Sequence, residues 1–291
     1  MIFQLKGNYD ILFLLDAFID TIKLVPFLFL TYFVMEWLEH KTGSRTQALI
    51  RRAGKAGPLF GGILGIFPQC GFSAAAANLY SGGLLTAGTL AAVFLSTSDE
   101  MLPVFLSEAV PVSFIIKILL LKMLLAVVSG FFLDFIFHTI IRKEIHYKNI
   151  HTMCESEHCR CEEGTLPSAI RHTLHITLFI FLITAVLNFL IERVGEENLS
   201  NLVLHMPVAG EFIAGLVGLI PNCASSVIIT QLYLGGVIGL GPMMTGLLAG
   251  SGVGILLLCR MNKKHPRQNL AMIAFVYVTS VFWGVLLDCL F

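Results

Sequence analysis

Charged residues are scarce in this chain of 291 residues. Asp, Glu, Lys and Arg together make up 13% of it, against about 25% in soluble domains, and the mean hydropathy is +0.82. A soluble fold would have to bury nearly all of this apolar surface in one core, so we exclude that class. The formal net charge is zero and says nothing about partners; we expect no nucleic-acid partner.

Two motifs are also missing. The sequence has no glycine-rich nucleotide-binding loop, which argues against a motor driven by nucleotide hydrolysis. It has no Cys-x-x-Cys either, which weakens the case for a thiol oxidoreductase, although Cys70 and Cys223 would form a redox pair if they lay within disulfide range. Several of the seven cysteines lie in apolar sequence, where a thiol packs as a small hydrophobe. A disulfide framework is therefore not expected.

Long apolar runs dominate the chain instead, and about 20 residues suffice to cross a bilayer as a helix. Six stretches are predicted to be full spans: 11–38, 84–107, 112–138, 170–192, 236–259 and 269–291. Two more apolar stretches, 57–82 and 207–235, are interrupted by Pro68-Gln69-Cys70-Gly71 and Pro221-Asn222-Cys223-Ala224. We divide the chain into a first membrane repeat (1–138), a His/Cys-rich cytosolic linker (139–169) and a second membrane repeat (170–291).

The two membrane parts are copies of one unit. A shift of 153 positions aligns them without a gap and matches proline, cysteine and tyrosine as well as glycine. The matched residues are Gly57, Gly62, Gly65, Pro68, Cys70, Ser73, Leu79, Tyr80, Gly82, Gly83 and Gly88 with Gly210, Gly215, Gly218, Pro221, Cys223, Ser226, Leu232, Tyr233, Gly235, Gly236 and Gly241.

Each interrupted stretch is either one broken crossing or a re-entrant hairpin, because proline breaks a helix and each arm spans about 16 Å. Basic residues gather in 41–55, in the linker and in 260–267. All three lie on the cytoplasmic side, as the positive-inside rule requires, only if the stretches are hairpins. We therefore predict an all-α polytopic membrane protein of the plasma or inner membrane, with both termini extracytoplasmic. Its two inverted repeats each have three transmembrane helices and a re-entrant broken-helix hairpin.

The hairpin tips are the first candidate site. Non-helical backbone inside a membrane is tolerated only within protein or beside a water-filled cavity, and helix ends there attract ions. Packing of small cysteine side chains against a neighbouring helix is the alternative. The candidate path residues at the tips are Gln69, Cys70, Ser73, Asn222, Cys223 and Ser226.

Carboxylates inside apolar sequence are the second candidate. Ser98, Asp99 and Glu100 lie midway along the second span, where a carboxyl needs water, a cation or a partner. Asp16 and Asp20 share one face of the first helix. Neutral carboxyls and a structural Asp20–Lys23 pair are the alternatives. Four further residues are expected to snorkel or to pair structurally: Lys117, Lys122, Asp134 and Asp288.

Histidine and cysteine suggest a third candidate site, in and beside the linker. Thiolates and imidazoles at this density suit zinc and softer metals, and a plain flexible linker with ordinary interface histidines is the alternative. The candidate metal ligands are Cys154, His158, Cys159, Cys161, His172 and His175.

These features resemble one family, the ArsP-related heavy-metal exporters, also described as ten-helix permeases or manganese transporters. The resemblance rests on the segment from Asp16 to Glu39, the paired FPQCG and IPNCA elements, the STSDE segment and the linker leading to His172-Thr173. Counting each hairpin as two helices gives the ten of the family. The arsenic permeases proper have a denser cysteine motif, so the resemblance does not imply organoarsenical transport.

The sequence therefore predicts a secondary transporter, not an enzyme. We expect it to export a metal ion, manganese or another divalent or heavy metal, by alternating access around the two hairpin tips, driven by an ion or proton gradient. We expect no permanently bound cofactor, with the metal ion and the lipid bilayer as partners; the oligomeric state stays open. The alternatives are a transporter of a sulfur- or arsenic-containing small solute and, less favoured, a thiol oxidoreductase.

Overall fold

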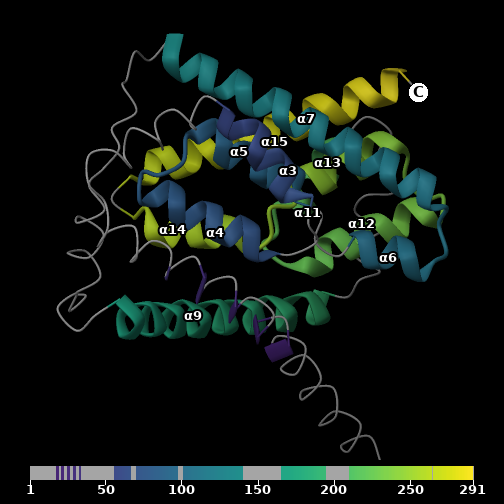
Figure 1. Cartoon of the computed structure of the whole chain (residues 1–291). Helices are drawn as coiled ribbons and strands as arrows, with labels where there is room; N and C mark the ends of the chain where they lie inside the picture. The colour runs from purple at the N-terminus through teal and green to yellow at the C-terminus, as the bar shows by residue number, and fades with distance from the viewer. Residues whose placement is uncertain are drawn as a thin grey trace, which may run out of the picture.

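The computed structural model describes residues 56–66, 70–97, 101–139, 165–194, 210–263 and 265–290, with nine helical residues between 18 and 33. Every element within these ranges is a helix, which confirms the predicted all-α class (Figure 1). Most of the first predicted span and nearly all of the linker lie outside the described ranges. The fourth predicted span lies within α9 (Thr165–Val194).

Five helices of the first half recur in the second; the first four begin at the shift of 153 found in the sequence, and the fifth begins one position later. The first three pairs match at both ends: α3 (Gly57–Gly65) with α11 (Gly210–Gly218), α4 (Cys70–Ser81) with α12 (Cys223–Leu234), and α5 (Ala87–Ser96) with α13 (Leu240–Ala249). The helix α6 (Met101–Ser107) corresponds to α14 (Gly254–Met261), and α7 (Val112–Thr139) to α15 (Pro266–Leu290). The internal duplication is therefore a duplication of structure.

Even the turn after each second arm is duplicated. Gly83 and Gly236 have φ values of 75° and 72°, the left-handed conformation that favours glycine. The amide of Leu84 donates to Leu79 O at 2.8 Å, and that of Val237 donates to Leu232 O at 2.9 Å. Both turns are Schellman-type ends that direct the chain into the next helix.

Two predicted spans are interrupted where the sequence suggested continuous helices. The α5 helix ends at Ser96, before the stretch predicted as 84–107 is complete. Within 236–259, α13 ends at Ala249 and α14 begins at Gly254. Four helical stretches still have the length and composition to cross a membrane among the described residues: Ala87–Ser107, Val112–His138, Leu240–Met261 and Pro266–Leu290.

Helix packing within each half follows one pattern. In the first half α5 packs on α3 and α7, and in the second α13 packs on α11 and α15. Between the halves the partners are exchanged: α4 packs on α14, and α12 packs on α6. Figure 1 shows these exchanged pairs on opposite sides of the central helices. Each half therefore completes the packing of the other.

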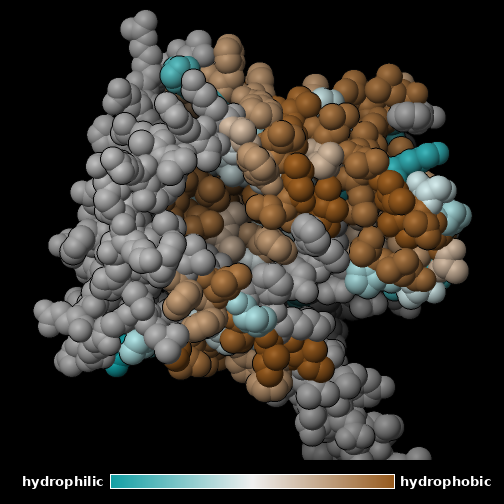
Figure 2. Space-filling model, in the orientation of Figure 1, coloured by the Kyte–Doolittle hydropathy of each residue, from teal (hydrophilic) through white to brown (hydrophobic). Residues whose placement is uncertain are grey.

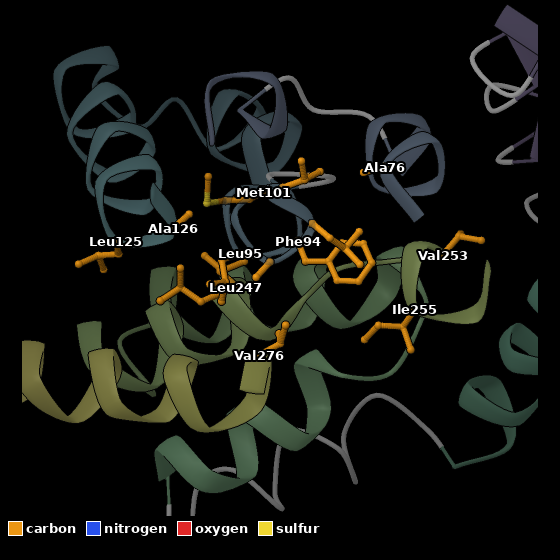
Figure 3. Close-up of a cluster of buried hydrophobic side chains, with 14 of the residues drawn as sticks. Ala76, Phe94, Leu95, Met101, Leu125, Ala126, Leu247, Val253, Ile255 and Val276 are labelled. Atoms are coloured by element: carbon orange, nitrogen blue, oxygen red, sulfur yellow. The ribbon is translucent and has the colours of Figure 1, made fainter. Parts of the chain in front are cut away.

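The apolar core lies where the halves meet. Phe94 and Leu95 of α5, Leu247 of α13 and Val276 of α15 are all nearly inaccessible to solvent and converge in one cluster (Figure 3). Large side chains on the outer face of α7, such as Leu124 and Phe135, are instead exposed. Figure 2 shows broad hydrophobic surface on the described part of this face, as expected for helices in contact with lipid.

The long helix α9 lies apart from the ten duplicated helices in Figure 1. It is joined to the second half by Arg260, whose guanidinium lies 4.1 Å from the ring centroid of Phe179, a cation–π contact. Its Phe181 ring meets Phe18 of the first span edge to face, with centroids 6.3 Å apart. The helix is therefore placed by aromatic contacts with both halves.

Candidate functional site

The interruptions at the ends of α5 and α13 are built alike. Thr97 leaves the helix with ψ 128° and Gly250 with ψ 85°. Both keep their amides in the helix, since Thr97 N donates to Val93 O and Gly250 N to Gly246 O, each at 3.0 Å. In the second half the chain then turns away, because Ser251 N donates to Ala249 O and not to Leu247 O, the acceptor that a continuing helix would use.

Small residues bring a second helix end to each interruption. A Cβ on Gly65, at the end of α3, would lie 2.9 Å from Val93 O, and one on Gly218, at the end of α11, would lie 3.0 Å from the Gly246 carbonyl carbon. Since Gly57 at the start of α3 adjoins Thr89 near the start of α5, the two helices run parallel. In each half, two helix C-terminal ends therefore lie side by side, and their partial negative charges add.

Lys122 connects the interruptions of the two halves. Its Nζ, from α7, donates to Thr97 O just beyond α5 and to Leu247 O in the last turn of α13, the latter at 2.8 Å. The lysine is 1% exposed, so it does not snorkel to the membrane surface. Ten residues of helix separate it from Val112, about 15 Å of rise, which is half of a hydrocarbon core of about 30 Å.

The opposite ends of α5 and α13 are capped by carboxylates. Asp134 Oδ1 accepts the Gly88 amide at 2.7 Å, and its Oδ2 accepts the Thr86 hydroxyl at 2.7 Å. Asp288 Oδ1 accepts the Gly241 amide at 2.9 Å. These aspartates are paired structurally, as expected, because each satisfies an N-terminal amide and offsets the positive end of the helix.

The second arms of the interrupted stretches begin beside this region. Ser73 of α4 is fully buried, and a Cβ on Gly254, at the start of α14, would lie 2.9 Å from Ser73 Cβ. Asn222 caps α12 by accepting the Ala224 amide at 3.3 Å, and Ser226 is buried in the same helix. The start of α4, the second arm of the first interrupted stretch, thus lies against the start of α14, next to the interruption of the other half.

The remaining candidate residues are only partly visible. Cys70, Cys223 and His172 occupy helical positions in α4, α12 and α9, but their side chains lie outside what the structure describes. His175 is exposed on α9, where its Nδ1 lies 3.3 Å from Arg171 O. Among the residues described, no three His, Cys, Asp or Glu side chains are grouped to hold a metal. The candidates wholly outside the described ranges are Gln69, Ser98, Asp99, Glu100, Asp16, Asp20, Cys154, His158, Cys159 and Cys161.

Sequence reasoning undervalued Lys122. An ionisable residue far from either end of an apolar helix was itself the signal, but the apolar stem of lysine allows snorkelling as an equally simple explanation. The contact that distinguishes a buried lysine from a snorkelling one is the long-range hydrogen bond from Lys122 to Leu247 O, which brings the second half to an ammonium of the first. The arrangement as a whole can hold a positive charge at mid-depth between two halves of a duplicated fold.

Comparison with known proteins gives one match. Residues 8–196 match the ArsP_2 family, described as "Putative, 10TM heavy-metal exporter". No curated protein and no solved structure matches the chain. The matched region covers the first half, the linker and α9, about two thirds of a chain that is multi-pass by its apolar helices. The chain therefore belongs to this family of ten-helix membrane proteins.

Proposed function

We propose that this protein is a secondary transporter that exports a heavy or divalent metal cation across the plasma or inner membrane. One observation carries the proposal: helix C-terminal ends from both halves meet at mid-depth around a single buried positive charge, Lys122. Many transporters built from repeats bind their substrate and coupling ions near the midplane, at the interface between the repeats. The description of the family supports metal as the cargo.

The parallel course of α3 and α5 supports the re-entrant reading of the first interrupted stretch. The start of α3 adjoins the start of α5, and α4 ends only six residues before α5 begins. A single crossing would place the starts of α3 and α5 on opposite sides of the membrane, whereas a hairpin returns the chain to the side it left. The same relation holds for α11 and α13, since Gly210 adjoins Pro242. Three crossings and a hairpin in each half make the repeats inverted.

The proposed path runs between the hairpin tips and the two interruptions. Asp99 and Glu100 follow Thr97 after one intervening residue, Ser98, and carboxylates at this depth would bind a cation or carry the coupling proton. The tip cysteines favour softer cations, and the carboxylates favour harder ones such as manganese. We propose Asp16 and Asp20 for the outer mouth of the path. The linker residues from Cys154 to Cys161, with His172 and His175, would capture metal on the cytosolic side.

A deletion strain tests the export of metal. Cells without the protein should become sensitive to, and accumulate, at least one of manganese, zinc, cadmium or arsenite, and the intact gene should reverse both effects. A response to arsenite alone would favour the small-solute alternative. Unchanged cell-associated content of all four would overturn the proposed function. Cys70→Ser and Cys223→Ser, made separately, distinguish cargo contact from packing by a changed order of metal preference.

A further inference from the structure

The ammonium of Lys122 binds carbonyls that a continuous helix would have satisfied. In α13, the donor for Leu247 O would be the amide of Ser251, but that amide turns to Ala249 O at 2.9 Å. Thr97 O lies just past the end of α5. Each carbonyl belongs to a different half, so one lysine replaces two missing donors across the interface between the halves.

The surroundings favour a cation independently of this lysine. The ends of α3 and α5 lie side by side, as do those of α11 and α13, and each end carries a partial negative charge of about half an elementary charge. Lys122 is almost fully buried, and the cost of removing an ammonium from water must be offset by such contacts. Ser251, in the second interruption, is fully buried, and its hydroxyl has no hydrogen-bond partner within the part of the chain that the structure describes.

The duplication shows that the equivalent helix contact can be built without a lysine. Gly130 and Asp134 of α7 correspond to Gly284 and Asp288 of α15, because both pairs make the same contacts with Gly88 and Gly241. These two pairs are offset by 154 positions, one more than the shift of the earlier helices, and the same offset places Val276 opposite Lys122. Val276 is fully buried, so the second half builds the same helix contact with an apolar side chain. The Lys122 ammonium is therefore the positive charge that contacts the C-terminal ends of both α5 and α13.

We propose that Lys122 is a resident cation: its ammonium and the transported metal ion occupy the same carbonyl-lined position between α5 and α13 in alternation. The proposal rests on the proposed function for the identity of the cargo. With no cargo, the lysine neutralises the helix ends and holds the halves together. When a metal ion arrives, the lysine must leave Thr97 O and Leu247 O, which frees the two halves to move relative to each other.

Metal-dependent thermal stability of the purified full-length protein tests this directly. Lys122→Met keeps the length of the side chain and removes its charge, so the empty carbonyls should bind Mn²⁺, Zn²⁺ or Cd²⁺ without competition. The concentration of metal chloride that half-maximally raises Tm should fall by about tenfold or more relative to wild type. Lys122→Arg keeps the charge, so its half-maximal metal concentration should not fall. Lys117→Met is the matched control, because Lys117 is exposed on the same helix.

Equal or weaker stabilisation of Lys122→Met by all three ions, compared with wild type, would overturn the proposal. If that variant does not fold, Lys122→Ala prepared with n-propylamine gives the same comparison, since the metal should then displace the free amine. Metal flux in wild-type proteoliposomes separates the two ideas. Metal flux by the wild type without tighter metal binding by Lys122→Met would contradict the resident cation alone. Tighter metal binding by Lys122→Met without any wild-type flux would contradict the proposed function and leave the cation site standing.

Discussion

The carboxylates of Asp134 and Asp288 hold equivalent positions in the two halves. Asp134 Oδ1 accepts the amide of Gly88 at 2.7 Å, and Asp288 Oδ1 accepts that of Gly241 at 2.9 Å. Each carboxylate thus fixes the beginning of a helix whose other end lies at the interruption near Lys122. The fold therefore places a negative group at the amino end and a positive group at the carboxyl end of α5, which opposes the helix dipole at both places.

Loss of the Asp134 carboxylate should destabilise the first half. Asp134→Ala leaves the Gly88 amide without its acceptor and removes one partner of the Thr86 hydroxyl, which still has Thr89 Oγ1 at 2.7 Å. Hydrogen bonds to a charged group contribute about 1.5–3 kcal/mol to the free energy of unfolding. A lower Tm in detergent is expected, with Asp134→Asn intermediate because its oxygen still accepts. Glu108→Ala is the control, since Glu108 is exposed in the turn after α6. An unchanged Tm for Asp134→Ala would show that the cap does not stabilise α5.

The close approach of α11 to α13 should not tolerate a methyl group. A Cβ on Gly218 would lie 3.0 Å from the Gly246 carbonyl carbon and 3.1 Å from Ala249 Cβ, so Gly218→Ala must separate the helix ends at a cost of about 1–3 kcal/mol. We expect a lower Tm and a loss of metal flux. Gly239→Ala is the matched control, because its nearest atom is 3.5 Å away. Equal behaviour of the two variants would contradict the described packing.

A hydrogen bond between α7 and α15 should couple the two halves. Trp283 Nε1 donates to Ser129 Oγ at 2.8 Å. The single variants Trp283→Phe and Ser129→Ala and the double variant form a thermodynamic cycle, with an expected coupling in the free energy of unfolding of about 0.5–1.5 kcal/mol. Strictly additive single effects would mean that this bond does not contribute to holding the halves together.

The hairpin reading makes a prediction about topology. A reporter fused after Phe291 should be found outside the cytoplasm, and one inserted within 139–169 should be found inside it. If each interrupted stretch were a single crossing, the loop at 41–55 and the linker would lie on opposite sides of the membrane. Linker and C-terminal reporters found on the same side of the membrane would remove the inverted arrangement, and with it the proposed relation between the halves.

The duplication was predictable from sequence because a gap-free match of Pro68 with Pro221 and Tyr80 with Tyr233 leaves little room for chance. Helix bounds then follow the shift of 153 residues, as α4 and α12 show. The interruption after Ser96 was not foreseen, since Ser-Thr-Ser-Asp-Glu contains neither proline nor glycine. Gly250 and Gly252 offered a signal in the second half, yet isolated glycines are common in transmembrane helices.

The contacts of Lys122 were beyond sequence reasoning for a different reason. Its partners are main-chain carbonyls, which every residue carries, so no residue type marks them. The bond to Leu247 O joins positions 125 residues apart and exists only because α7 of one half reaches α13 of the other. Asp134 and Asp288 were expected to snorkel or to pair structurally, and they pair. Their partners, the amides of Gly88 and Gly241, are again main-chain groups that no residue type marks in the sequence.

The central claim is that the two halves move a metal cation between them. Flux of Mn²⁺, Zn²⁺ and Cd²⁺ through the purified protein in proteoliposomes, under an imposed proton gradient, tests it most directly. We predict flux of at least one of these ions above that of protein-free liposomes, with a clear reduction in the Cys70→Ser/Cys223→Ser double variant if the tips contact the cargo. Absence of flux for all three ions, in protein shown to be folded, would contradict the account.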